Sequence, residues 1–250
     1  MPAPPVQVIG PKALIQARRA IVACEACPRL REYCRAVARI RRAAFRNDVY
    51  WGRPVPGYGD PTARLLILGL APAAHGANRT GRVFTGDGVG ASGDFLMSAL
   101  HRARLANLPT SQRVDDGLRL RGVFIAAAAR CAPPANRPLP EEVAACRHHL
   151  AAEVAALLRL RVVVALGKVA WDAWLGLVGT YTALPRPRPA FGHGAVARLA
   201  PPGTAGPAGL TLVGCFHPSR QNTNTGRVTA AMYDNVLGRA AALAGLGTRG

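Results

Sequence analysis

Residues 64–87 read RLLILGLAPAAHGANRTGRVFTGD, and this stretch decides the fold class. Within residues 64–68, Arg64 is followed by four apolar residues that lead directly into glycine and proline, which is typical of a buried strand that ends in a loop. The loop is rich in small residues, which let a ligand approach the backbone closely. We therefore expect a pocket with small walls. Its polar and aromatic side chains would be His75, Asn78, Arg79, Thr80, Arg82, Phe84, Thr85 and Asp87.

Three more apolar runs predict buried strands, at residues 123–129, 162–166 and 210–216. Helical spacing precedes or separates the strands, at residues 12–23, 29–42, 94–104, 139–158, 169–177 and 228–243. Strands that alternate with helices predict an α/β fold with a parallel sheet covered on both faces. Polar motifs follow three of the four strands, so we expect them to meet at the carboxyl edge of the sheet, where ligands bind in such folds.

The length of 250 residues is enough for one full hydrophobic core. We expect one domain over residues 12–250, preceded by a flexible tail over residues 1–11. The Pro/Gly-rich segment 185–209 is expected to be irregular surface. No run approaches the roughly 18 apolar residues that span a bilayer, and the chain does not start like a signal peptide, so we expect a cytoplasmic protein without membrane association.

The chain is strongly basic, with 32 Lys plus Arg against 13 Asp plus Glu and a formal net charge of +19. A field of this sign favours polyanions, and nucleic acid is the simplest partner. Only Lys12 and Lys168 are lysines, so part of the excess reflects a compositional bias towards arginine. The remainder still indicates a nucleic-acid partner, because self-repulsion of like charges destabilises a compact state.

Six cysteines in a cytosolic chain are better explained as metal ligands or buried thiols than as disulfides. Cys24 and Cys27 have Cys-x-x-Cys spacing, and Cys131 and Cys146 form a second, more widely spaced pair. Four thiolates can hold zinc or a [4Fe–4S] cluster, and the wide second spacing favours the cluster over a compact zinc ribbon. The two remaining cysteines are expected to be buried thiols: Cys34 and Cys215.

Three features together resemble a known family: the 69–87 motif, the motif HPSRQNTNTGR at residues 217–227, and the cysteine set 24, 27, 131 and 146. They are similar to the iron–sulfur uracil-DNA glycosylases of the fifth family, also called type b, over about residues 24–243. The resemblance implies a three-layer α/β/α sandwich with a central four-stranded parallel sheet and a [4Fe–4S] cluster. It also implies removal of uracil, hypoxanthine, xanthine, ethenocytosine and hydroxymethyluracil from double-stranded DNA, and we expect a monomer.

The sequence departs from the wider superfamily at two positions. Many uracil glycosylases have Asp, Asn or Glu after the first core strand to hold the attacking water, whereas residues 70–73 here are apolar. The second strand often ends in an Asn that reads uracil, whereas residues 126–129 are all alanine. Loss of the Asn agrees with relaxed base specificity, which the resemblance implies. Loss of the water-holding side chain leaves Asp87, the matching position of the family, as the candidate for activating water.

Base excision defines the expected roles of the remaining motif residues. His217 can donate a hydrogen bond to the departing base, and Asp87 can activate water and offset the cationic sugar. Phe84 is the expected stacking platform for the extruded base. Other contacts to the base or the flipped nucleotide are assigned to His75, Asn136, Asn222 and Ala71. Contacts to the DNA duplex are assigned to Ser219, Arg220 and Gln221, which we expect on a loop after His217. Arg79 is assigned to a phosphate contact, with a structural contact as the alternative.

Three of these residues also have a purely structural interpretation. Phe84 could be a core residue, Asp87 a turn residue between glycines, and His217 a structural histidine. A different class of function is a non-catalytic iron–sulfur or zinc module that binds nucleic acid. It shares the charge and the cysteines but gives no reason for both long motifs to be present together.

Overall fold

The computed structural model describes residues 12–88, 90–199 and 209–247. The expected tail over residues 1–11 lies outside these ranges. The sheet has six strands in the order β1-β3-β2-β4-β6-β5. Its four central strands are parallel, and the two outer strands pair antiparallel to them. The strands are β1 (Tyr58–Gly59), β2 (Leu65–Gly69), β3 (Val123–Ala127), β4 (Val162–Leu166), β5 (Val196–Arg198) and β6 (Thr211–Cys215).

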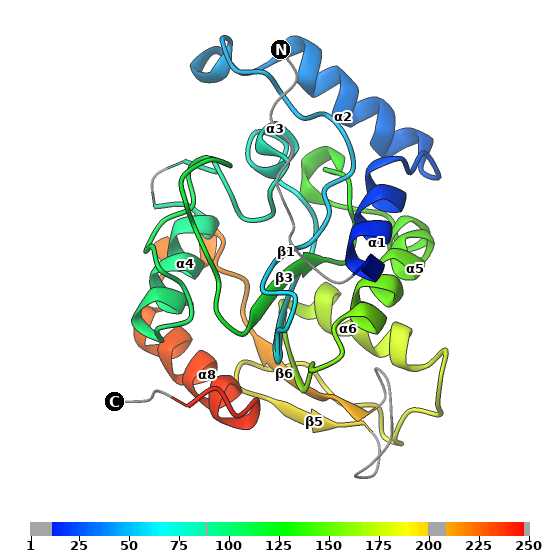
Figure 1. Cartoon of the computed structure of the whole chain (residues 1–250), viewed down its shortest axis with the longest axis vertical. Coiled ribbons are helices and arrows are strands. Elements are labelled where there is room, and N and C mark those ends of the chain that lie inside the picture. Colours follow the sequence, from blue (N-terminus) through cyan, green and yellow to red (C-terminus); the bar gives the residue numbers. More distant parts are fainter. Residues whose placement is uncertain (1–11, 89, 200–208, 248–250) are drawn as a thin grey trace.

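Helices cover both faces of this sheet, so the prediction of a three-layer α/β/α sandwich is confirmed (Figure 1). Helices α4 and α8 lie on one face, and α1, α5 and α6 lie on the other. The long helices are α1 (Lys12–Val22), α2 (Pro28–Ile40), α4 (Ser92–Arg102), α5 (Pro140–Ala156), α6 (Lys168–Val178) and α8 (Ala230–Leu243). The short elements are η1 (Ala43–Phe45), α3 (Ala77–Thr80), η2 (Pro134–Asn136) and α7 (Arg220–Asn224).

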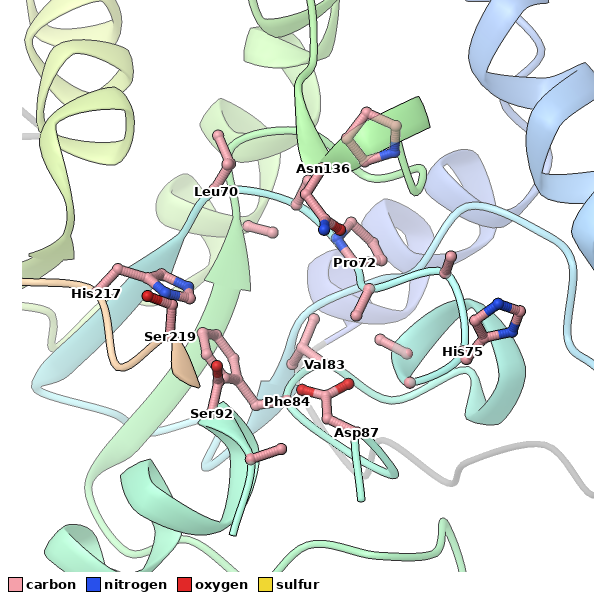
Figure 2. Close-up of a pocket in the computed structure, with 18 of the residues that line it drawn as sticks. Leu70, Pro72, His75, Val83, Phe84, Asp87, Ser92, Asn136, His217 and Ser219 are labelled. Carbon is pink, nitrogen blue, oxygen red and sulfur yellow. The ribbon is translucent and has the colours of Figure 1, made fainter. Parts of the chain in front are cut away.

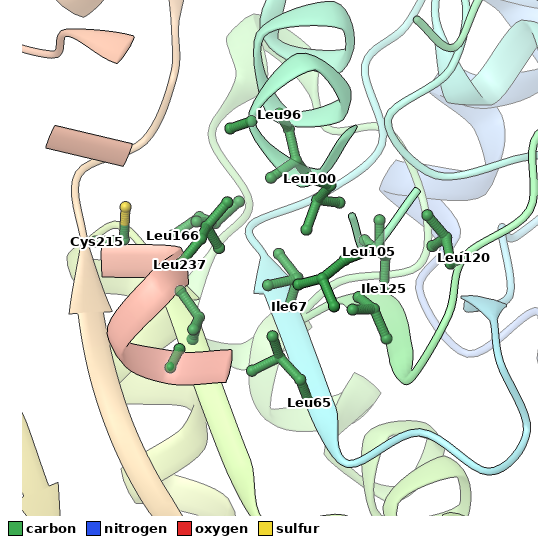
Figure 3. Packing of buried hydrophobic residues seen from close by; sticks show 14 of the residues in the cluster. Leu65, Ile67, Leu96, Leu100, Leu105, Leu120, Ile125, Leu166, Cys215 and Leu237 are labelled. Atoms are coloured by element: carbon green, nitrogen blue, oxygen red, sulfur yellow. The ribbon is translucent and has the colours of Figure 1, made fainter. Parts of the chain in front are cut away.

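Alternating side chains of the buried strands build two separate cores. Leu65 and Ile67 of β2 pack with Leu96 and Leu100 of α4 on one face, in the cluster that Figure 3 shows. On the opposite face, Leu66 and Leu68 pack with residues of α1, α5 and α6. This period-two alternation of fully apolar strands is what a parallel sheet buried on both faces requires. None of the helices in the described ranges is long and apolar enough to cross a membrane.

The predicted central sheet of four parallel strands is confirmed, and two edge strands that the sequence did not predict extend it. β1 has two residues and β5 has three, so neither carries the apolar periodicity by which a strand is detected in a sequence. β5 lies inside the segment 185–209, which was expected to be irregular, and residues 200–208 of that segment are outside the description. Short edge strands of this kind limit pairing with other chains.

A second correction concerns the segment after β6, which was expected to be a loop. Residues 220–224 form the short helix α7, because the Ser219 side chain caps it by accepting a hydrogen bond from the backbone N–H of Asn222 at 3.3 Å. A serine at this position stabilises a helix start by about 1 kcal/mol. The second polar motif is therefore more ordered than its composition predicts.

Candidate active site

A pocket of about 540 Å³ opens at the carboxyl edge of the parallel sheet. The loops that follow β2, β3 and β6 all contribute to its lining, so the polar motifs meet where the strand pattern predicts. One wall consists of small or apolar residues that directly follow β2, from Leu70 to Ala74, and Ala127 at the end of β3 faces the same space. Figure 2 shows the polar and aromatic side chains arranged around this space.

Phe84 lies between the end of β2 and His217, in a conformation that glycines make possible. Its ring centroid is 6.2 Å from that of His217, and the two planes are tilted by 32°. A Cβ at Gly69 would lie 2.9 Å from the Phe84 ring, and a Cβ at Gly93 would collide with the Phe84 carbonyl oxygen. Phe84 itself has φ +51°, which is a strained value for a residue with a side chain. Such strain, with the ring against the pocket, favours a functional platform over a core residue.

Asp87 closes the far end of the same loop. Its Oδ1 atom is buried and has no hydrogen-bond partner among the described residues. A Cβ at Gly76 would collide with this oxygen, so glycine is required there for the carboxylate to reach the pocket. Burial raises the pKa of Asp87 to about 6, and the neighbouring Asp94 adds to the rise while Arg79 and Arg220 oppose it. The carboxylate is therefore ionised at neutral pH but close to its titration range.

His217 faces the pocket from the loop after β6. Burial lowers the pKa of its imidazole to about 4, so the ring is neutral at physiological pH. Its backbone is held in place by Asn222, whose Nδ2 donates to the His217 carbonyl oxygen at 2.8 Å. The expected role of Asn222 as a base contact is not supported by this arrangement, because its amide bonds the loop and Asn222 is absent from the pocket lining.

Part of the pocket rim comes from a segment that the sequence did not implicate. Arg42 and Phe45, from the end of α2 and from η1, line the pocket together with His75. The Tyr50 hydroxyl lies 3.0 Å from Nδ1 of His75, and burial together with Arg42 and Arg79 lowers the pKa of that histidine. Figure 2 shows His75 on the opposite side of the pocket from His217. Asn136 and Ala71 also line the pocket, as predicted.

Arg79 does not occupy the place expected of a DNA contact. Its three guanidinium nitrogens bond the chain itself: Nε to the carbonyl oxygen of His75 at 2.9 Å, Nη1 to Asp48, and Nη2 to the carbonyl oxygen of Gly86 at 2.8 Å. Arg79 therefore shapes the loop that carries Asp87. Arg82 is likewise buried and internal, with its guanidinium bonded to Thr85, Ser111 and Asp116.

The remaining duplex-contact candidates lie around α7. Ser219 and Arg220 line the mouth of the pocket, and Arg220 and Gln221 are exposed. Ser219 is half-buried, and its hydroxyl is engaged in capping α7. Only Arg220 and Gln221 of this group thus present free surface next to the pocket.

The four predicted ligand cysteines gather at one place next to this edge of the sheet. Cys24 and Cys27 precede α2, Cys131 follows β3, and Cys146 lies on α5. Burial raises the pKa of the Cys27 thiol to about 11, with further increases from Cys146, Cys131, Glu142 and Cys24, so the four thiols are close enough to act on one another. In the described part of the chain, no group of three or more His, Cys, Asp or Glu side chains has the arrangement that holds a metal ion. Cys34 and Cys215 are buried, as predicted.

Comparison with known proteins places this site in a family. The sequence model of the Uracil DNA glycosylase superfamily matches residues 56–240. Type-5 uracil-DNA glycosylases from Mycobacterium tuberculosis and Thermus thermophilus are both 49% identical to the chain, over 95% and 90% of its length and 84% and 96% of theirs. One from Pyrobaculum aerophilum is 47% identical over 90% of the chain and 91% of its own length. The chain belongs to the uracil-DNA glycosylase superfamily, in its type-5 branch.

Membership in the superfamily agrees with the placement of the pocket. The matched residues, 56–240, include all six strands and every loop that follows β2, β3 and β6. α1 and α2 precede the matched residues. Cys24 and Cys27 lie between these two helices, and the rim residue Arg42 follows α2. The type-5 glycosylase thus combines a superfamily pocket with an N-terminal helical segment that borders both the pocket and the cysteines.

Proposed function

We propose that the protein is a DNA-repair glycosylase that extrudes uracil from double-stranded DNA and hydrolyses its N-glycosidic bond. The observation that carries this proposal is the pocket that Asp87 and His217 both line, half-buried, beside the platform Phe84. A base inside a duplex is inaccessible, so it must leave the stack at a cost of a few kcal/mol. Stacking on Phe84 offsets about 1–3 kcal/mol of that cost without requiring a particular base.

Bond cleavage uses the two titratable groups in different ways. As the C1′–N bond breaks, its electron pair moves to the base, and the neutral His217 ring donates a hydrogen bond to the developing anion, which is worth about 3–4 kcal/mol. The Asp87 carboxylate stabilises the cationic sugar, orients a water molecule towards C1′ and accepts its proton. The products are the free base and an abasic site.

The chain is expected to be a monofunctional enzyme of broad base specificity. Neither motif contains a lysine that could form a Schiff base with the sugar, so strand cleavage is not expected. The walls formed by Leu70, Ala71 and Ala127 offer no side-chain hydrogen bonds that would reject a particular base. Hypoxanthine, xanthine, ethenocytosine and hydroxymethyluracil are the further substrates that we propose, with Asn136 and His75 as adaptable polar contacts. We expect a cytoplasmic monomer.

We assign Cys24, Cys27, Cys131 and Cys146 as ligands of a [4Fe–4S] cluster. Four thiols are the donor set that such a cluster takes, and their mutual proximity supports the assignment. The surroundings fit an anionic group as well, because two arginines, Arg31 and Arg130, are buried beside these cysteines. The cluster would fix α2 and α5 against the loop after β3. Anaerobic purification, iron and sulfide analysis and the visible spectrum distinguish it from zinc.

Duplex binding is assigned to the exposed residues beside the pocket mouth, Arg220 and Gln221, and to the basic rim around Arg42. Arg79 is reassigned to loop structure, because its guanidinium is engaged inside the protein. Affinity for DNA is expected to fall steeply with rising salt, since counterion release scales with the number of phosphates contacted. Binding that does not respond to salt would contradict the basic surface as the DNA footprint.

The deciding experiment is a single-turnover assay on duplexes that each carry one damaged base, followed by alkali cleavage at abasic sites. Uracil release by the wild-type protein and its loss in Asp87→Ala would support the proposed function. Binding of the uracil duplex without release would instead point to a non-catalytic nucleic-acid module. A panel with hypoxanthine, xanthine, ethenocytosine and hydroxymethyluracil measures the breadth of substrates in the same format.

A further inference from the structure

Two arginines next to the cysteines are almost completely buried. Arg31 of α2 is 3% exposed, and Arg130, directly before Cys131, is 1% exposed. Arginine is rarely this buried unless an anion balances its charge, because desolvating a charge is costly. Both side chains therefore need a negative partner of matching strength.

The partners of Arg31 balance its charge only in part. Its Nη1 lies 3.9 Å from the Cys131 sulfur, and its Nη2 donates to the Gly52 carbonyl oxygen at 3.1 Å. Glu25 is 3.4 Å away, but that carboxylate is largely exposed and makes a closer ion pair with Arg35, at 2.6 Å. Of the two buried acceptors that face Arg31, the Gly52 carbonyl is neutral, whereas the Cys131 sulfur can carry a negative charge as a thiolate.

Arg130 differs from Arg31 because it has a buried carboxylate partner, but two of its donors are unused. Its Nη2 donates to Glu153 at 2.7 Å, but Glu153 also accepts from the Gly57 N–H at 2.7 Å and lies in the field of Arg18. The Nε and Nη1 atoms of Arg130 are buried and have no partner among the described residues. The Cys146 thiol lies near Arg130, because the charge and the backbone N–H of that arginine both act to lower the pKa of the thiol. Orphaned buried donors of this kind indicate an anionic group that the protein chain alone does not supply.

We propose that Arg31 and Arg130 are the residues that neutralise the iron–sulfur cluster and set its reduction potential. This inference rests on the cluster assigned under the proposed function. Four thiolates around the cluster core leave an excess of negative charge, and adding one electron from an external reductant increases that excess. Buried positive charge next to two of the ligands stabilises the reduced form, so it raises the potential and also favours retention of the cluster.

Arg31→Gln and Arg35→Gln form a matched pair for the test. Both arginines lie on α2 and both contact Glu25, but Arg35 is exposed, whereas Arg31 is buried against the Cys131 sulfur. Full-length proteins are purified anaerobically, and the potential is measured by a mediated redox titration followed by electron paramagnetic resonance. For Arg31→Gln we expect the one-electron equilibrium to shift about tenfold towards the oxidised form, a decrease of about 59 mV. Arg35→Gln should match the wild type, and Arg31→Lys should recover part of the shift.

Cluster retention gives a second readout that does not depend on activity. Arg31→Gln should lose its visible absorbance faster than Arg35→Gln in the presence of an iron chelator. A wild-type protein with a cluster and an Arg31→Gln variant of equal potential and equal retention would overturn the inference while leaving the cluster assignment intact. A wild-type protein that releases uracil but holds no iron would overturn both the cluster and this inference. Arg130→Gln should lower the potential in the same direction as Arg31→Gln, and Arg130→Lys, which keeps the charge, should recover part of the shift.

Discussion

The loop after β2 and the loop after β6 enclose the same pocket, yet they deliver opposite kinds of titratable group. Burial raises the pKa of Asp87 to about 6 in the first and lowers that of His217 to about 4 in the second. One physical cause acts in both, since desolvation always disfavours the charged form. Because the reference pKa values of the two groups differ, the outcome at neutral pH is an ionised acid and a neutral imidazole in one pocket, which is the pair that the proposed mechanism requires.

The two loops also differ in how they are held. The first is fixed from inside by the half-buried Arg79 and the buried Arg82, and by glycines that leave room for Phe84 and Asp87. The second is held by a helix cap at Ser219 and by the Asn222 amide. Backbone strain and buried charge are thus concentrated in the loop after β2, which carries Asp87. This difference indicates that Asp87 is the more costly group to maintain and the more consequential one to lose.

Removing the acid should have the largest effect. Asp87→Asn keeps the shape but removes the charge that activates water, so the single-turnover rate of uracil release should fall about 10²- to 10⁴-fold. Asp115→Asn is the matched control, because Asp115 is an exposed acid outside the pocket. An Asp87→Asn rate within about threefold of wild type would show that another group handles the water.

Removing the imidazole should have the next largest effect. His217→Ala deletes the donor to the departing base, and the same assay should show a loss of about 10²- to 10³-fold. His148→Ala changes an exposed histidine on α5 and should leave the rate unchanged. If the loss for His217→Ala is confined to DNA binding, with the chemical step intact, His217 is a binding residue and the comparison of the two loops fails.

The pH profile distinguishes the two groups within the wild-type enzyme. Asp87 must be ionised, so the rate should decrease about tenfold per unit as the pH falls below about 6. His217, with a pKa of about 4, stays neutral from pH 5 to 8 and should therefore cause no further change in rate over that interval. Rates measured from pH 5 to 8 on one uracil duplex test this, and Asp87→Asn should flatten the acid limb.

The smallest predicted effect is on stability, and it has the opposite sign from the effect on activity. Folding raises the Asp87 pKa from its usual 3.8, so the folded state favours the protonated acid and loses stability as the pH rises to about 6. At pH 8, Asp87→Asn should therefore raise the free energy of unfolding by about 1–2 kcal/mol, after allowance for partial solvent screening. At pH 4 the variant and the wild type should unfold alike in urea. Equal stability at pH 8 would show that the carboxylate carries no desolvation cost.

The sequence predicts the central part of the fold because that part follows one pattern. The four parallel strands are continuous apolar runs, and both polar motifs begin where such a run ends, so their meeting in one pocket follows from topology alone. The edge strands β1 and β5 are too short for any periodicity to register. The sequence did not predict α7, because residues 219–224 have the composition of a polar loop. The helix depends on its cap, the Ser219 side chain.

The arrangement of the site is less predictable than the fold, because a sequence motif does not determine the direction in which each side chain points. Arg79 lies within the 69–87 stretch, yet its guanidinium turns inward to Asp48 and to two carbonyl oxygens. Arg42 and Phe45 line the pocket from a segment that precedes the motif in the chain, and nothing local marks them. Contacts of this kind depend on how α2 and η1 pack over the sheet edge, which is a tertiary property.

The pocket has one part that tolerates change and one part that does not. The rigid part contains Phe84, which has a φ of +51° and packs against Gly69 and Gly93. It also contains Gly76, which packs against Asp87. Almost any substitution at these positions would displace the reacting groups. The wall of small residues at Ala71, Ala73 and Ala74 carries no such constraint from the chemistry. Selection or design can therefore alter which bases are accepted by enlarging these alanines one at a time, while the catalytic step is inherited unchanged.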